Sequence, residues 1–221
     1  MRRLIVVAVS LVSLSVIAAP AVAGLLAAPP TEISVSDNFF APATPSAQDF
    51  HSGASFHWQR DLSSTGDHNV VQDAKLFNSG EPTTGPIDFS VSASAGTYHY
   101  YCQVHGTPGG SPVNGMNGIV KVRPLQTSPL TVNEFDTFGV MWADANTNTG
   151  SLFDVRYRIG GRPWTTWLND TAKTHATFGR NDRPAKVVPG KTYKVAVRSE
   201  KTNTAKRSGW SPPLSYKLTG P

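Results

Sequence analysis

Four residues with metal-binding side chains occur at spacings that could bring them to one ion. Cys102 is the only cysteine; His105 follows it after two residues and Met116 after ten more. His68 lies upstream, at the start of an apolar run. One thiolate, two imidazoles and one thioether form a soft ligand set, which suits copper alternating between Cu(I) and Cu(II) in a His₂Cys site with a weak methionine ligand.

The lone cysteine has two interpretations. It excludes an intramolecular disulfide and a zinc site built from several cysteines. A Cys-x-x-His pattern alone says little, because a single cysteine is most often a small buried hydrophobe. An unpaired thiol in an oxidising compartment is a liability, however, and metal ligation would explain its retention.

Strand periodicity predicts how these side chains are positioned. In residues 96–102, alternation puts Tyr98, Tyr100 and Cys102 on one face, with His99 and Tyr101 on the other. A Gly/Pro loop follows, and residues 118–122 form another strand. The remaining histidines are expected on the surface or on outer strand faces: His51, His57, His99 and His175.

The whole chain has the composition of an all-β protein. It has 221 residues, 39% of them hydrophobic and 16% charged, which is enough for one large or two small folded domains. Short β-like runs alternate with Gly, Pro, Ser and Asn clusters, and no helical heptads occur. A Pro/Ser segment at residues 124–129 separates two blocks. We therefore expect two β-sandwich domains, at residues 31–124 and 125–221.

The two blocks carry opposite charge. The first has four basic and eight acidic residues, and the second has fourteen basic and seven acidic. No Lys/Arg run is dense enough to predict nucleic-acid binding. We expect the basic residues of the second block to form a solvated surface that attracts anionic cell-wall polymers or headgroups.

The N-terminus has the layout of a secretory signal peptide. Arg2 and Arg3 precede an apolar run at residues 4–19, and Ala21-Val22-Ala23 forms a cleavage motif. An uncleaved anchor is the alternative, because residues 4–23 are about long enough to span a bilayer. We expect cleavage after residue 23, leaving a mature protein without a membrane span that is secreted, periplasmic or associated with the cell wall.

The first block resembles the cupredoxins of the plastocyanin/azurin family. The order and spacing of several short pieces carry the resemblance: Asn38-Phe39-Phe40-Ala41-Pro42, Ser55-Phe56-His57-Trp58, Asp67-His68-Asn69-Val70-Val71, Phe77-Asn78-Ser79-Gly80, residues 96–105, and Met116-x-Gly118-x-Val120. The resemblance implies a Greek-key β-sandwich with one type 1 copper. His68, Cys102 and His105 would be the equatorial ligands and Met116 the axial one.

The resemblance also implies roles around the metal. Asn69 would brace the ligand loops by hydrogen bonds. Tyr101, facing outward, matches a position implicated in electron exit, and the ring edge of His105 would reach the surface and pass electrons to a partner. The segment between His105 and Met116 is longer than in plastocyanins, but its Gly and Pro residues allow it to loop out and return Met116 to the metal.

The second block resembles a fibronectin type III domain, an immunoglobulin-like sandwich. Trp142 would be its buried tryptophan and Tyr193 its tyrosine corner. Phe153, Val155 and Tyr157 share one face of a strand. His175 has no nucleophile partner, so this block shows no catalytic constellation.

These features predict single-electron transfer with a redox partner protein whose identity stays open, and no enzymatic activity. Multicopper oxidases resemble repeated cupredoxins with further His-x-His and His-Cys-His motifs, which this sequence lacks. Copper storage or delivery is a second hypothesis, and surface adhesion without a metal is a third. The last strand of the first block runs away from the metal, which would place the second block at the far end and leave the copper edge free.

Overall fold

The computed structural model describes residues 29–50, 54–127, 137–202 and 204–217, which form strands and one short 3₁₀ helix, η1 (Arg180–Asp182). The predicted signal sequence, His51 and the end of the Pro/Ser segment lie outside these residues. No helix in the described ranges is long and apolar enough to cross a membrane.

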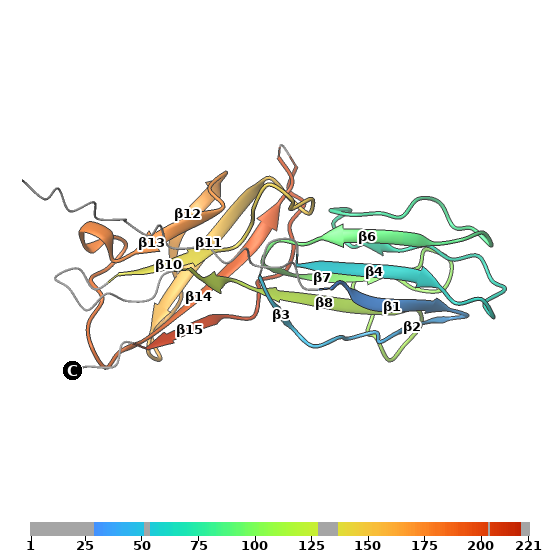
Figure 1. Ribbon diagram of the computed structural model, residues 1–221, viewed down its shortest axis with the longest axis horizontal. Helices are drawn as coiled ribbons and strands as arrows, with labels where there is room; N and C mark the ends of the chain where they lie inside the picture. Colours follow the sequence, from blue (N-terminus) through green and yellow to red (C-terminus); the bar gives the residue numbers. More distant parts are fainter. Residues whose placement is uncertain (1–28, 51–53, 128–136, 203, 218–221) are drawn as a thin grey trace, which may run out of the picture.

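The first half of the chain forms two four-stranded sheets that pack on each other (Figure 1). One has the order β2-β1-β4-β6, with β1 and β4 parallel, and the other has the order β3-β8-β7-β5. Their strands are β1 (Thr31–Ser36), β2 (Phe39–Ala41), β3 (Gln48–Asp49), β4 (Ser55–Arg60), β5 (Val71–Gln72), β6 (Asp88–Ser92), β7 (Gly96–Tyr101) and β8 (Asn117–Arg123).

Alternating side chains build the core between these sheets. Phe56 and Trp58 of β4 are fully buried and meet Tyr98 and Tyr100 of β7 in one hydrophobic cluster. The Trp58 and Tyr100 rings lie edge to face with centroids 5.1 Å apart, a favoured aromatic geometry. Cys102 belongs to the same cluster, so the predicted inward face of residues 98, 100 and 102 is confirmed.

The second half of the chain forms a three-stranded sheet, β13-β10-β9, and a four-stranded sheet, β12-β11-β14-β15. Their strands are β9 (Leu125–Gln126), β10 (Phe138–Met141), β11 (Leu152–Ile159), β12 (Thr165–Thr171), β13 (His175–Phe178), β14 (Thr192–Glu200) and β15 (Leu214–Lys217). A separate core holds Phe153 and Val155, with Tyr157 packed against it, as the alternation predicts. Trp142 is fully buried there.

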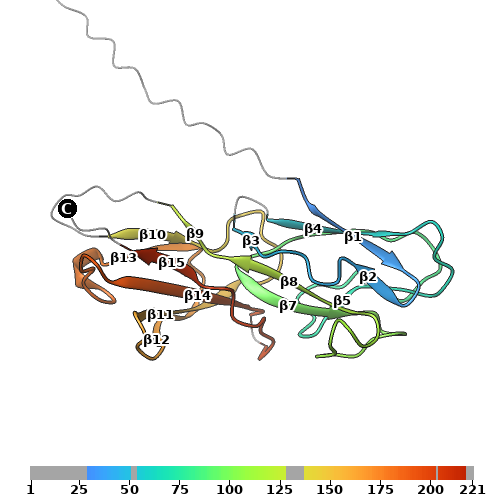
Figure 2. The same cartoon turned by 90° about the horizontal axis from the view of Figure 1, so that it is seen from below.

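The two halves lie end to end, and backbone hydrogen bonds join them directly (Figures 1 and 2). Thr97 in β7 and Gly209 exchange both N–H···O bonds, at 3.0 and 2.8 Å, and the Ala95 N–H donates to the Trp142 carbonyl. Because these contacts lie at the start of β7 and just before it, the second half lies away from Cys102, which follows the last residue of the strand. The second half is therefore docked onto the first and does not hang from a linker alone.

A buried hydroxyl network reinforces this junction. The Tyr98 hydroxyl lies 2.7 Å from Ser94 Oγ, 3.1 Å from Thr149 Oγ1 and 2.9 Å from Ser199 Oγ. Tyr98 and Ser94 come from the first half, and Thr149 and Ser199 from the second. All four residues are fully buried. A buried hydroxyl is costly unless it is hydrogen-bonded, so each half stabilises polar groups of the other.

Removing the Tyr98 hydroxyl should destabilise the protein. Tyr98→Phe leaves three buried hydroxyl groups with one partner fewer, and we expect a loss of about 1–3 kcal/mol in the free energy of unfolding. The control is Tyr100→Phe, since the buried Tyr100 hydroxyl makes no hydrogen bond of normal geometry among the described residues. Urea unfolding measures both; an equal loss in the two variants would contradict the network's role.

On the outer face of the first half, His57 joins three strands. Its Nδ1 lies 2.7 Å from Glu32 Oε2 in β1, and its Nε2 lies 2.7 Å from Asp88 Oδ1 in β6. The hydrogen bond to Asp88, followed by the bond to Glu32, raises the pKa of His57 above its usual value, against the opposing effect of burial. The protonated form can donate to both carboxylates, so it is the form that the fold stabilises.

The raised pKa predicts a pH-dependent stability. The contribution of His57 should be complete below the unfolded-state pKa of about 6.5 and lost as the pH rises through the higher folded-state value. His57→Gln should therefore destabilise the protein more at about pH 5.5 than at about pH 8.5, by about 0.5 kcal/mol, because both carboxylates are exposed. Urea unfolding at both pH values tests this, with exposed His175→Gln as the control; a pH-independent difference would contradict it.

Candidate metal centre

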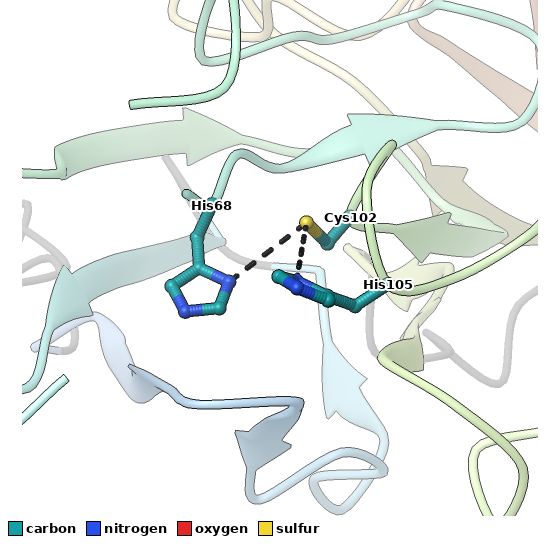
Figure 3. A group of neighbouring side chains, drawn as sticks. All are labelled: His68, Cys102 and His105. Atoms are coloured by element: carbon teal, nitrogen blue, oxygen red, sulfur yellow. Dashed lines mark hydrogen bonds between the residues drawn. The ribbon is translucent and has the colours of Figure 1, made fainter. Parts of the chain in front are cut away.

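Three of the four predicted ligands meet at one end of the first half. The ligand atoms of His68, Cys102 and His105 all lie within 4.8 Å of one another. Cys102 Sγ is 3.9 Å from His68 Nδ1 and 3.7 Å from His105 Nδ1, and a nitrogen of each ring points toward the sulfur (Figure 3). His68 and Cys102 are fully buried, whereas His105 is partly exposed.

These distances fit a first-row metal ion bound by three ligands. With metal–sulfur and metal–nitrogen bonds of about 2.3 and 2.0–2.1 Å, a trigonal plane separates sulfur from nitrogen by about 3.8 Å. The two observed separations lie within 0.1 Å of that value. A thiolate and two imidazoles in a trigonal arrangement are the donors of blue-copper sites.

Backbone hydrogen bonds hold Met116 next to two of the other predicted ligands. The Cys102 N–H donates to the Met116 carbonyl at 3.0 Å, and the Met116 N–H donates to the His105 carbonyl at 2.9 Å. The first bond continues the ladder between β7 and β8, in which Tyr101 pairs with Asn117. The Met116 side chain is fully buried in the same core as Cys102. Its backbone is thus fixed next to two of the three clustered ligands.

The long segment between His105 and Met116 folds back on Asn117. The Thr107 N–H donates to Asn117 Oδ1 at 3.1 Å, and Asn117 Nδ2 donates to the Asn114 carbonyl at 2.6 Å. A Cβ at Gly106 would lie 2.3 Å from the Met116 carbonyl oxygen, so this close return requires glycine. The loop therefore closes against Asn117, next to Met116, and Met116 keeps its backbone bonds to Cys102 and His105.

Asn69 connects the segment that carries His68 to the segment that carries Cys102. Its Oδ1 accepts a hydrogen bond from the Gln103 N–H at 2.9 Å, and its Nδ2 donates to the Gly80 carbonyl at 2.8 Å and to Gln103 Oε1 at 2.6 Å. Asn69 follows His68, and Gln103 follows Cys102. These bonds hold the histidine and the cysteine at a fixed separation.

Sequence reasoning missed Asp37, which lies in the turn between β1 and β2. Its Oδ1 is 3.0 Å from His68 Nε2, the ring nitrogen opposite the one that faces the cysteine. Loop 64–66 supplies further backbone and hydroxyl donors. The bond from His68, followed by those from the loop, holds the pKa of Asp37 far below its usual range. The carboxylate is therefore ionised at neutral pH.

The prediction that Tyr101 faces outward is only partly right. Tyr101 lies on the face of β7 opposite Tyr98 and Tyr100, but it is only 8% exposed. It pairs with Val71 in β5 on one side and Asn117 in β8 on the other, so neighbouring strands flank it. Alternation within one strand predicts the face on which Tyr101 lies, but not how far neighbouring strands enclose that residue.

A second group of acidic side chains belongs to an ion-pair network. Asp154, Asp170 and Glu200 have carboxylate oxygens within 4.8 Å of one another. Arg198 lies 2.7 Å from Asp154, and Arg207 lies 2.7 Å from Glu200 and 3.5 Å from Asp170. These guanidinium groups account for the cluster without a metal.

No family model matches the sequence, and no curated protein matches it either. What this centre can bind is therefore judged from its own geometry.

Loss of the Asn69 bridge should weaken metal binding. Asn69→Ala removes three hydrogen bonds that fix the spacing of His68 and Cys102. If this centre holds a metal ion, its affinity for that ion, measured with Cu(II), should fall by about 10- to 100-fold. Asn169→Ala is the matched control, because Asn169 is exposed in β12 of the second half, away from this centre. Competitive titration with a chelator measures both affinities; equal values would show that Asn69 does not support the ligands.

Proposed function

We propose that this chain is an exported, mononuclear copper protein of the cupredoxin type that transfers single electrons. The convergence of one buried thiol and two imidazole Nδ1 atoms, at separations that fit a trigonal metal, is the observation that carries the proposal. His68, Cys102 and His105 would hold the ion, with Met116 as the axial ligand. Bound copper would supply a centre that accepts and releases one electron.

The surrounding residues suit this role because they restrict movement of the ligand-bearing loops and keep water from the ligand atoms. The bonds of Asn69 and Asp37 hold the ligand-bearing loops in one geometry, and a fixed geometry limits rearrangement between two oxidation states. His68, Cys102 and Met116 are fully buried, which keeps water away from the ligand atoms.

A partner protein would approach on the side of His105. This is the partly exposed member of the three clustered ligands. Val104 and Val113, both exposed, belong to the segments that connect Cys102 to Met116. Exposed apolar side chains in the segments around a partly exposed ligand suit transient docking, and the second half lies at the opposite end of β7.

For the second half we propose a fibronectin type III-like fold. The arrangement of three and four strands, the buried Trp142 and the contacts of Tyr193 support it. The Tyr193 hydroxyl accepts a hydrogen bond from the Val188 N–H at 2.8 Å and donates to the Lys186 carbonyl at 3.3 Å, as in a tyrosine corner. Contact of this basic half with anionic cell-wall polymers is part of the same proposal.

Reconstitution of the full chain with Cu(II) tests the metal and its ligands. We expect one copper per chain and an intense visible thiolate-to-copper band, which Cys102→Ser abolishes and Met116→Leu shifts. His57→Gln, which changes a histidine outside the centre, should keep the band. Copper content and absorption spectra measure these outcomes.

Two results would contradict the proposal. A colourless, copper-free product from folded protein would exclude a type 1 copper centre. Tight copper binding without reversible one-electron reduction in voltammetry would indicate storage or delivery instead of electron transfer.

A further inference from the structure

The hydrogen bond between Asp37 and His68 determines which imidazole nitrogen faces the metal site. An ionised carboxylate only accepts hydrogen bonds, so His68 Nε2 carries a proton and donates it to Asp37 Oδ1 over 3.0 Å. In a neutral imidazole the other nitrogen then has a free lone pair. That nitrogen, Nδ1, is the one that lies 3.9 Å from Cys102 Sγ.

Asp37 is itself held in place by the segment that leads to His68. Its carboxylate accepts hydrogen bonds from Ser64 Oγ at 2.7 Å, from the Thr65 and Gly66 N–H groups at 2.9 Å each, and from Thr65 Oγ1 at 3.1 Å. These donors leave the carboxylate little freedom to turn away from the imidazole. These hydrogen bonds thereby join the turn between β1 and β2 to the loop that leads to His68.

Gly66 permits this close arrangement. A Cβ at this position would lie 3.1 Å from His68 Nε2 and 3.4 Å from Asp37 Oδ1. A side chain would therefore crowd the hydrogen bond between the two residues. Loop 64–66 thus contributes both donors and the space in which the carboxylate and the imidazole meet.

We propose that Asp37 is a positioning residue, which fixes the orientation and tautomer of His68 and makes the His68 Nδ1 atom a more basic, stronger metal ligand. The copper part of this inference rests on the proposed function. A carboxylate hydrogen-bonded to a ligating imidazole raises the ligand's basicity. Its negative charge also stabilises the more positive ion, so the centre favours Cu(II) over Cu(I) and has a lower reduction potential.

Two substitutions separate orientation from charge. Asp37→Asn keeps an oxygen that accepts the Nε2 proton but removes the negative charge, so it should preserve the tautomer. Asp37→Ala removes both the accepting oxygen and the negative charge. Asp49→Asn is the control for charge alone, because Asp49 pairs with Arg123 at the end of β8 remote from Cys102.

The first measurement needs no metal. Nitrogen-15 NMR of the folded, metal-free chain, with its histidines neutral, should show the proton of His68 on Nε2 in the wild type and in Asp37→Asn. Asp37→Ala should show a mixture of tautomers. An Nδ1 proton in the wild type, or an unchanged tautomer in Asp37→Ala, would overturn the orienting role.

The second measurement is the reduction potential of the copper-loaded protein. In Asp37→Asn we expect Cu(II) affinity to fall about tenfold relative to Cu(I), which raises the potential by about 59 mV. Asp49→Asn should change it much less, and equal shifts in the two variants would overturn the electronic role. Failure of the wild type to bind copper would overturn the proposed function and the electronic role together, whereas the metal-free spectra would still decide whether Asp37 orients His68.

Discussion

Burial of a thiol and an imidazole inside an apolar core is the constraint on which the rest of the structure depends. Cys102 and His68 are fully buried, and buried polar groups are costly unless they find partners. Asp37 satisfies the far nitrogen of His68, and Asn69 holds the backbone next to Cys102. The bonds that satisfy these groups are the same bonds that fix their geometry. The near nitrogen of His68 is thereby left facing the Cys102 sulfur across 3.9 Å.

Strand β7 connects the junction between the two halves to Cys102. Its first residues pair with Gly209 of the second half, Tyr98 enters the shared hydroxyl network, and Cys102 follows its last residue. Six residues of strand span about 20 Å, so the junction and the thiol lie at opposite ends of one rigid element. The second half is therefore fixed in orientation relative to the cluster of His68, Cys102 and His105, and it leaves the partly exposed His105 uncovered.

Local patterns predict only part of this arrangement. Alternation in residues 98–102 identifies the core face because the period of a strand is a local property. Asp37 carries no comparable signal: it is one aspartate in a turn, and only the parallel pairing of β1 with β4 brings that turn near the loop before His68. The hydroxyl partners of Tyr98 include Ser199, about a hundred residues away, so the docking of the two halves could not be read from spacing either.

The loop between His105 and Met116 shows why spacing along the sequence does not determine where Met116 lies. Ten residues intervene, and their number alone does not fix where Met116 lies. Met116 is instead positioned from both sides by backbone bonds to Cys102 and His105, one of which extends the ladder between β7 and β8. Asn117 then closes the loop on its base. The position of Met116 therefore follows from the ladder between β7 and β8 and not from the length of the loop.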